Sequence, residues 1–156
     1  MKAELVAISA GTVALALILG ALFFQYALGY PPCEMCHWQR WPHIAAAAIG
    51  LGGGLLLLSD TVRLPTAVPV AAVTLLLVAT SGALGVYHAG VEWHWWAGPS
   101  ACTTGFVFNG TLDLNARVPM CDRAAWRLYG ISMAGYNAII SLGAAALGSF
   151  LLVRKS

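Results

Sequence analysis

Four long stretches of the chain contain no Asp, Glu, Lys or Arg, and they limit the possible folds more than any other feature. They are Leu5–Pro32, Trp41–Ser59, Leu64–Gly90 and Leu128–Val153. A helix needs about 20 residues to cross the apolar core of a bilayer, and each stretch is close to that length or longer. A soluble domain of 156 residues has no room to bury four such helices. Hydrophobic residues make up 60% of the chain and charged residues 9%, which also indicates a membrane protein.

The pattern predicts an all-α membrane protein, with residues 1–156 forming a single domain built as a bundle of four transmembrane helices. We expect the two cysteine-bearing connections of this bundle to lie outside the cytoplasm. The expected helices cover about residues 4–28, 39–58, 65–88 and 127–153, and the cysteine-bearing loops cover about 29–38 and 90–126. The first helix should end near Leu28, because Pro31 and Pro32 just beyond it lack a backbone N–H and disfavour helical geometry in the residues before them.

All four cysteines fall in these two loops. Two helices separate the loops, so Cys33, Cys36, Cys102 and Cys121 should lie on one face of the membrane, with both termini on the other. Basic residues divide evenly between the two faces, but those in the long loop count less towards orientation. Cysteine pairs that stay oxidised belong outside the cytoplasm. We therefore expect both termini to be cytoplasmic.

The pair Cys33-Glu-Met-Cys36 has the spacing of a redox-active dithiol. Two thiols this close can form a small disulfide that another thiolate easily attacks. Arg40 lies one helical turn beyond Cys36, where its charge would favour the thiolate. Cys36 is also the cysteine nearest the bilayer along the second helix, where a lipid-soluble oxidant must arrive. These features indicate a dithiol relay that delivers electrons into the membrane.

Three other interpretations fit parts of the pattern. Residues 33–37 match Cys-x-x-Cys-His, the attachment motif of c-type haem, and would make the chain a membrane-anchored cytochrome. That reading gives no role to Cys102, Cys121 or Arg40. The four cysteines could instead bind a structural zinc ion, although the second pair lacks the usual short spacing. Two structural disulfides could staple the loops, which explains neither the close first pair nor the arginine.

Several motifs resemble those of one known family. The segment Cys33-Glu-Met-Cys36-His-Trp-Gln-Arg40 resembles the Cys-x-x-Cys-x-x-x-Arg signature of the DsbB family of disulfide bond formation proteins. Further similar segments are Gly98–Cys102, Val118–Asp122, Trp126–Met133 and Asn137. Together with the hydropathy of the four helices, the resemblance covers essentially the whole chain.

The resemblance implies a multi-pass enzyme of the bacterial inner membrane with periplasmic cysteine loops. Such an enzyme reoxidises a periplasmic, thioredoxin-fold thiol oxidase like DsbA and passes two electrons to membrane quinone, either ubiquinone or menaquinone. By position, Cys102 would accept the partner's thiolate, and its disulfide partner Cys121 would then attack Cys33. Cys36 would be released as a thiolate facing the quinone, with Arg40 stabilising the negative charge. His88 is a further candidate quinone contact, with an interfacial residue as the alternative. No metal site is expected.

Overall fold

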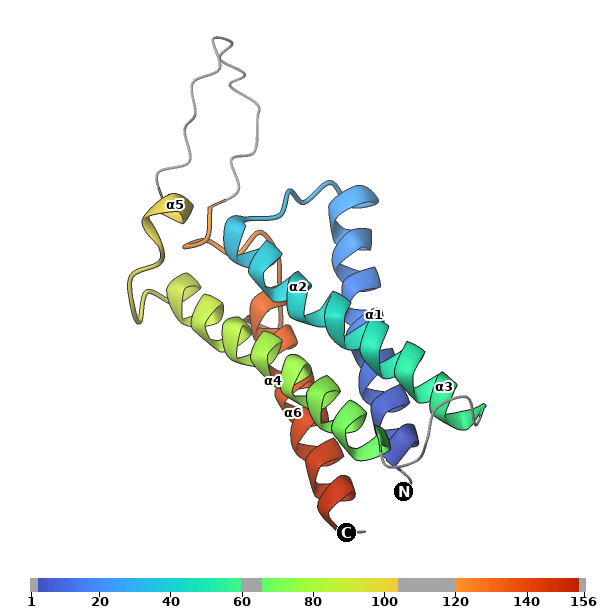
Figure 1. The fold of residues 1–156 in the computed structure, drawn as a ribbon. Helices are drawn as coiled ribbons and strands as arrows, with labels where there is room; N and C mark the ends of the chain where they lie inside the picture. Colours follow the sequence, from blue (N-terminus) through green and yellow to red (C-terminus); the bar gives the residue numbers. More distant parts are fainter. Residues whose placement is uncertain (1–2, 60–65, 104–119, 155–156) are drawn as a thin grey trace.

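The computed structural model describes residues 3–59, 66–103 and 120–154 (Figure 1). Its helices are α1 (Ala3–Tyr26), α2 (Glu34–Ala47), η1 (Ala48–Gly53), α3 (Gly54–Leu58), α4 (Ala67–Glu92), α5 (Ser100–Thr103) and α6 (Met133–Val153). Its strands are β1 (Arg127–Leu128) and β2 (Ile131–Ser132). Four helical segments are long and apolar enough to cross a membrane, namely Ala3–Tyr26, Glu34–Leu58, Ala67–Glu92 and Met133–Val153. The predicted four-helix membrane fold is therefore confirmed.

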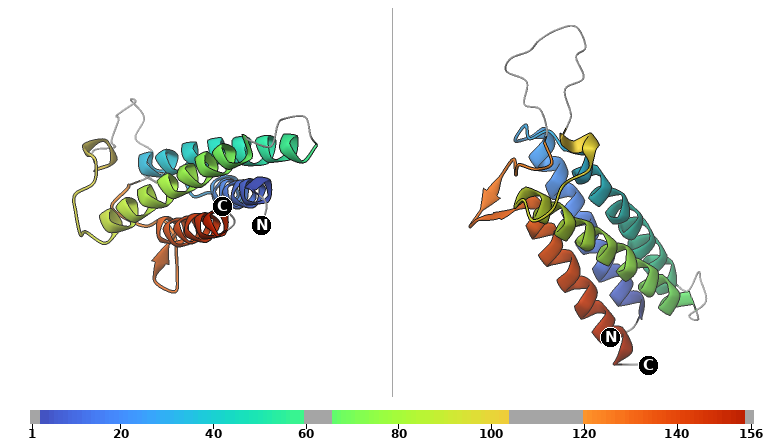
Figure 2. Two further views of the ribbon diagram at one scale, coloured as in Figure 1. Left: turned by 60° about the horizontal axis from the view of Figure 1, so that its bottom comes forward. Right: turned by 90° about the vertical axis from the view of Figure 1, so that its left-hand side faces the viewer.

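The four segments form one bundle with both chain termini at the same end (Figures 1 and 2). The connection from α1 to α2 and the short helix α5 lie at the opposite end (Figure 1). We call this opposite end the cysteine end, because Cys33, Cys36, Cys102 and Cys121 all lie there. This arrangement agrees with the count of crossings in the sequence. Of the predicted turn at 59–63, the structure describes only Ser59. Four basic residues used to predict the orientation lie outside the described residues, namely Lys2, Arg63, Arg117 and Lys155.

Small side chains fill most of the interior, and large apolar side chains face outward. The main core cluster includes Ala7, Ala10, Ala14, Ala46 and Ala71. Leu19, Phe23, Leu76 and Leu147, by contrast, are each more than half exposed. In a bilayer the outward side chains meet lipid tails that are as apolar as themselves. Small interior residues let the helices approach closely enough for backbone contact.

Gly50 lies where α1, η1 and α4 cross. A Cβ atom on Gly50 would lie 2.6 Å from the carbonyl oxygen of Ala7 and 2.7 Å from Cγ2 of Thr74. On the facing helix, a Cβ on Gly11 would lie 2.9 Å from the backbone nitrogen of Leu51. Because backbone atoms stand on both sides, this crossing leaves no space for a side chain.

Helix α2 begins at Glu34, before the predicted start near residue 39. Cys33 occupies the N-cap position in extended geometry (φ −80, ψ 172), and its sulfur accepts a hydrogen bond from the backbone N–H of Cys36 at 3.2 Å. A thiol can therefore take the place of the usual hydroxyl or carboxylate cap. As a result Cys36 lies in the first helical turn, and Pro42 lies in the helix interior and not at its start.

The boundaries around the longer loop also differ from the prediction. Helix α4 continues to Glu92, and α6 begins at Met133, because residues 127–132 form an antiparallel hairpin of β1 and β2. Tyr129 (φ 49) and Gly130 (φ 81) form the turn, and this left-handed pair is typical of tight hairpins. An apolar, uncharged run does not by itself distinguish such a hairpin from the first turns of a helix.

Replacing Gly50 by alanine should destabilise the bundle by about 1–3 kcal/mol, the usual range for overpacking a tight interior. Gly52→Ala in the same π-helical segment is the matched control, because its added Cβ would have no atom of another described helix within 4 Å. Thermal unfolding of the two variants in detergent measures the difference. Equal stability of the two variants would contradict the proposed close crossing.

Candidate active site

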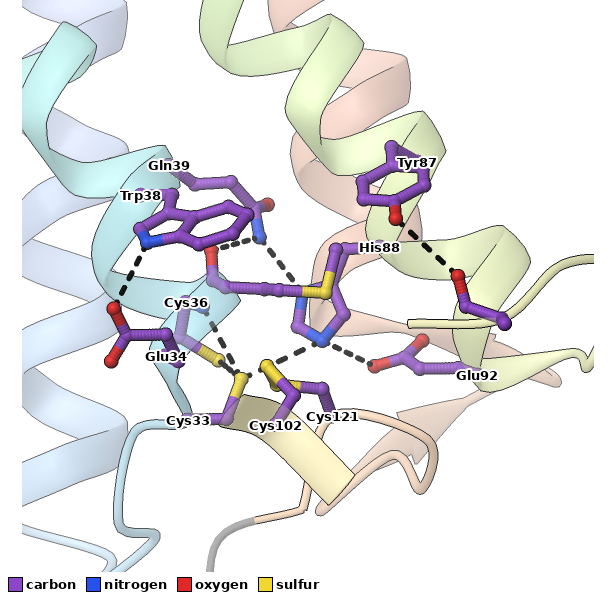
Figure 3. The surroundings of a disulfide bond; sticks show 12 residues. Cys33, Glu34, Cys36, Trp38, Gln39, Tyr87, His88, Glu92, Cys102 and Cys121 are labelled. Carbon is purple, nitrogen blue, oxygen red and sulfur yellow. Dashed lines mark hydrogen bonds and ion pairs between the residues drawn. A yellow bond between two sulfur atoms is a disulfide. The ribbon is translucent and has the colours of Figure 1, made fainter. Parts of the chain in front are cut away.

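The four cysteines gather where the start of α2 approaches the end of α4 (Figure 3). Cys102 and Cys121 form a disulfide, which is the pairing that the resemblance implies. Cys33 and Cys36 are free thiols whose sulfur atoms lie 2.7 Å apart. Cys33, Cys102 and Cys121 are buried in one cluster, with Cys36 packed against it. The structure therefore contains one oxidised and one reduced pair side by side.

The two pairs meet at Cys33 and Cys121. The sulfur atoms of these residues and Nε2 of His88 all lie within 4.8 Å of one another. Thiol–disulfide exchange requires the attacking sulfur to approach the disulfide directly, so the contact brings the two pairs close to exchange distance. The same three atoms resemble a zinc ligand set, but a disulfide sulfur carries no thiolate charge. The sulfur of Cys121 is therefore unsuited to coordination in this oxidation state.

The thiol of Cys33 is held in its protonated form. The hydrogen bond with the sulfur of Cys36, followed by burial, raises the pKa of Cys33 above its ordinary value. Both sulfurs lie at the N-terminus of α2, which favours negative charge on either of them. Arg40 adds a positive charge that acts on Cys36 from one turn further along the helix. The environment therefore favours negative charge on Cys36 over Cys33.

Arg40 turns towards the bundle. Its Nη1 donates a hydrogen bond to Oε1 of Gln25 on α1 at 2.6 Å. Its Nε is buried and has no hydrogen-bond partner among the described residues. An arginine that merely extended towards the lipid headgroups would leave these donors in water. The geometry therefore differs from that of an ordinary interfacial arginine.

A cavity of about 930 Å³ opens beside Arg40. Its apolar wall comes mainly from the halves of α1 and α6 nearest the cysteine end and includes Ala16, Leu17, Gly20, Ala21, Phe24, Met133, Tyr136 and Ile140. Its polar lining includes Cys33, Cys36, Arg40 and His88. Trp126 also lines the cavity, with its ring centroid 5.0 Å from that of Phe24. A mostly apolar cleft with a few convergent polar groups is the usual form of a small-molecule site.

A chain of side-chain hydrogen bonds runs from the sulfur cluster into the bundle. Gln39 Nε2 lies 2.8 Å from Nδ1 of His88, and Gln39 Oε1 accepts a hydrogen bond from Asn137 Nδ2 at 2.8 Å. Asn137 Oδ1 in turn lies 2.8 Å from Nε2 of His43. Sequence reasoning assigned no role to Gln39 or His43 and used Asn137 only as part of a motif. The sequence could have indicated them. Gln39 and His43 lie four residues apart on one face of a largely apolar helix, and polar residues so placed usually face the interior of a membrane bundle.

Glu92 is another residue that sequence reasoning missed. Its side chain is only 6% exposed, and its Oε1 lies 3.7 Å from Nε2 of His88 (Figure 3). Its Oε2 has no hydrogen-bond partner among the described residues. The structure thus brings together Cys33, Cys121 and His88 from the predicted site and adds Glu92 to them. By contrast, His37 of the Cys-x-x-Cys-His match is exposed on the outside of α2.

These observations define a helical membrane protein with two interacting cysteine pairs, as in disulfide-forming oxidoreductases. The family profile described as "Disulfide bond formation protein DsbB" matches residues 3–151, and the chain belongs to this family. A protein from Polaromonas sp. named "Disulfide bond formation protein B" is 26% identical over 155 residues, covering 89% of this chain and 84% of the relative. One of the same name from Aromatoleum aromaticum is 26% identical over 147 residues, covering 86% and 82% respectively. No solved structure matches the chain.

The contact between the two pairs can be tested without any partner. In a Cys36→Ala/Cys102→Ala variant, only Cys33 and Cys121 remain, and mild oxidation should join them because their sulfurs already lie within 4.8 Å. Non-reducing peptide mapping would identify the bond. The single variant Cys36→Ala is the control, since its Cys102–Cys121 disulfide should leave Cys33 open to alkylation. Two unpaired thiols in the double variant would contradict the geometry.

Proposed function

We propose that this protein reoxidises a DsbA-like, thioredoxin-fold thiol oxidase and passes the electrons to membrane quinone. One observation carries the proposal. The sulfurs of Cys33 and Cys121 share one buried cluster, and Cys33 and Cys36 also line the cavity beside Arg40. Membership of the DsbB family supports disulfide bond formation as the general activity. The partner and the electron acceptor are the parts that we add.

The residues around the cavity fit a quinone. Its apolar wall on α1 and α6 suits a ring with a hydrocarbon tail, and the buried Nε of Arg40 offers an unused donor for a carbonyl oxygen. Cys36 and Arg40 would hold the ring, with His88 further along the lining. Quinone, when bound, supplies a two-electron acceptor. The charge of Arg40 acts in a partly dry medium, where it is worth more than in bulk water.

The exchange steps among the cysteines follow from their contacts. A thiolate of the partner attacks Cys102, and the electron pair of the broken disulfide leaves on Cys121. Cys121 then attacks Cys33 of an oxidised Cys33–Cys36 pair, forming the Cys33–Cys121 bond and releasing Cys36 as a thiolate. The partner's second thiolate closes the partner's own disulfide and frees Cys102. Cys102 re-forms its bond to Cys121 and releases Cys33, so both electrons end on the first pair.

The oxidation state of the structure corresponds to the end of this sequence. Cys102 and Cys121 are joined, whereas Cys33 and Cys36 are thiols. In that state the raised pKa of Cys33 keeps its proton in place. The helix N-terminus and Arg40 favour negative charge on Cys36, which faces the cavity. The chain's own charges therefore favour electron departure from Cys36.

The proposal includes an orientation in the bacterial inner membrane. The cysteine end would face the periplasm and both termini the cytoplasm. Two arguments support this choice: stable disulfides belong outside the cytoplasm, and basic residues of a long loop count little in the positive-inside rule. A soluble oxidase could reach the cysteine end only from the periplasm.

Steady-state reduction of a soluble quinone, with a reduced DsbA-like partner as electron donor, tests the proposal. Arg40→Ala should slow quinone reduction by about 10²–10³-fold, as expected for loss of a preorganised charge. Exchange between the Cys102–Cys121 disulfide and the partner, followed in a single turnover, should stay within about twofold of the parent rate because no thiol of that pair changes. Arg40→Lys should retain part of the activity, because it keeps the charge but loses the planar fork.

Arg154→Ala is the matched control, because Arg154 stacks on Phe150 at the other end of the bundle. It should change neither rate. Absence of quinone reduction by the parent protein would refute the proposed function. Equal loss of both rates in Arg40→Ala would make Arg40 a structural anchor, and unchanged rates would remove it from the electron exit.

A further inference from the structure

We infer that Gln39 holds His88 in the neutral tautomer protonated at Nε2, which makes His88 a fixed hydrogen-bond donor to the sulfur of Cys33. Gln39 is then a positioning residue for the exchange reaction, since it acts through the imidazole ring and touches no sulfur itself. The consequence for catalysis rests on the proposed relay through Cys33. The tautomer itself follows from the hydrogen bonds alone.

The backbone of α2 fixes the orientation of the Gln39 amide. Its Nε2 lies 3.0 Å from the backbone carbonyl oxygen of Met35. A carbonyl oxygen only accepts hydrogen bonds, so the NH₂ group of Gln39 must face it. The same nitrogen lies 2.8 Å from Nδ1 of His88 and has no lone pair to offer (Figure 3). Nδ1 must therefore be the acceptor, which leaves the proton of a neutral ring on Nε2.

Asn137 keeps the Gln39 amide from flipping. Oε1 of Gln39 accepts from Nδ2 of Asn137 at 2.8 Å. Nδ2 of Asn137 also donates to the backbone carbonyl of Ser81 at 3.1 Å, which fixes the orientation of that amide as well. Ser141 Oγ donates to Asn137 Oδ1 at 2.8 Å and satisfies the other side. Two backbone carbonyls, one on α2 and one on α4, thus fix both side-chain amides.

The same hydrogen bond from Gln39 disfavours a positive charge on the His88 ring. A positively charged imidazole carries protons on both nitrogens, so Nδ1–H would point at the NH₂ group of Gln39. Two donors would then face each other at a site where His88 is 3% exposed and Gln39 7% exposed. Both side chains are almost completely buried, and an unpaired polar group is costly in such surroundings. The arrangement therefore disfavours the charged ring as well as the other tautomer.

The Nε2–H group points into the sulfur cluster. It lies 3.6 Å from Sγ of Cys33 and 3.7 Å from Oε1 of Glu92, and the backbone of Cys121 is a further hydrogen-bond partner of the imidazole. When Cys102 re-forms its bond to Cys121, the electron pair of the broken Cys33–Cys121 bond leaves on Cys33. A donor already in place stabilises that leaving thiolate without movement of the ring. Because the donor is neutral, Arg40 remains the positive charge on the reduced pair, and this favours final charge on Cys36.

The titratable and charged groups around His88 come from every neighbouring element. Cys33 and Cys36 lie at the start of α2, with Arg40 one turn further along it. Cys121 lies in the segment before β1, and Glu92 follows His88 on α4. Arg127 of β1 acts electrostatically on Glu92. A charged Glu92 would favour a positively charged His88 ring. The hydrogen bond from Gln39 to Nδ1 of His88 opposes this effect of Glu92.

Nitrogen NMR of histidine-labelled protein in nanodiscs reads the tautomer directly, with His88→Asn used to assign the signals. His88 should show a protonated Nε2 and a bare Nδ1 from about pH 5 to about pH 8, without titration. A proton on Nδ1, or formation of the charged ring within this range, would overturn the inference.

Gln39→Glu tests whether the side-chain amide of Gln39 determines the protonation of His88. A carboxylate at this position accepts a hydrogen bond from Nδ1–H, so His88 should become able to titrate within the same pH range. Thr74→Val is the matched control on α4, because the hydroxyl of buried Thr74 donates to the carbonyl of Val70, about four helical turns from His88. It should leave the His88 signals unchanged. An unchanged His88 spectrum in Gln39→Glu would refute the role of Gln39.

A thiol measurement adds the functional readout. In the Cys36→Ala background Cys33 is the single free thiol, and its alkylation rate can be followed against pH. Adding Gln39→Glu should lower the midpoint of the pH dependence of Cys33 alkylation by about one pH unit. The reason is that a positively charged His88 stabilises the Cys33 thiolate more than a neutral one. A midpoint that does not move would contradict donation to Cys33. Failure of the parent protein to reduce quinone would refute the proposed function alone and leave the tautomer result standing.

Discussion

The hydrogen bond between the side-chain amides of Gln39 and Asn137 holds the site together. It joins α2 to α6, and Asn137 also bonds to Ser81 of α4, so one polar contact fixes three helices. The helices around it meet mainly through alanine and glycine, which allow close approach but specify little about orientation. Polar groups in this interior must find partners within the protein. The amides therefore determine how the cysteine end of α2 faces α4, and thus where Cys33 meets His88.

The arrangement of the helices places different charges beside the two thiols of the first pair. Both sulfurs lie at the start of α2, but the sulfur of Cys33 faces the imidazole of His88, whereas the charge of Arg40 acts on Cys36. Negative charge is thus favoured at the sulfur of Cys36, which lines the cavity together with Cys33. The oxidised Cys102–Cys121 pair touches the reduced pair through Cys121 at the other side. In the proposed relay, electrons therefore enter from the loop side and leave towards the lipid side.

The large features of the fold could be predicted because lipid imposes them. Uncharged runs of sufficient length predicted the four helices, and counting crossings placed all cysteines at one end. Details that depend on single hydrogen bonds were missed. Capping by Cys33 moved the start of α2 to Glu34, and the hairpin at 127–132 moved the start of α6 to Met133. The polar chain through Gln39 was also missed, because helical spacing shows which residues share a face but not which residue on another helix they meet.

The central claim is the route from Cys102 through the Cys33–Cys121 contact to Cys36, and one trapping experiment tests it directly. Fully oxidised protein, free of quinone, is mixed with a reduced thioredoxin-fold partner that keeps only its attacking cysteine. Non-reducing peptide mapping then locates every bond. The account predicts the partner on Cys102, a Cys33–Cys121 disulfide and a single free thiol on Cys36. A partner joined to Cys33 or Cys36, with the Cys102–Cys121 disulfide intact, would contradict it.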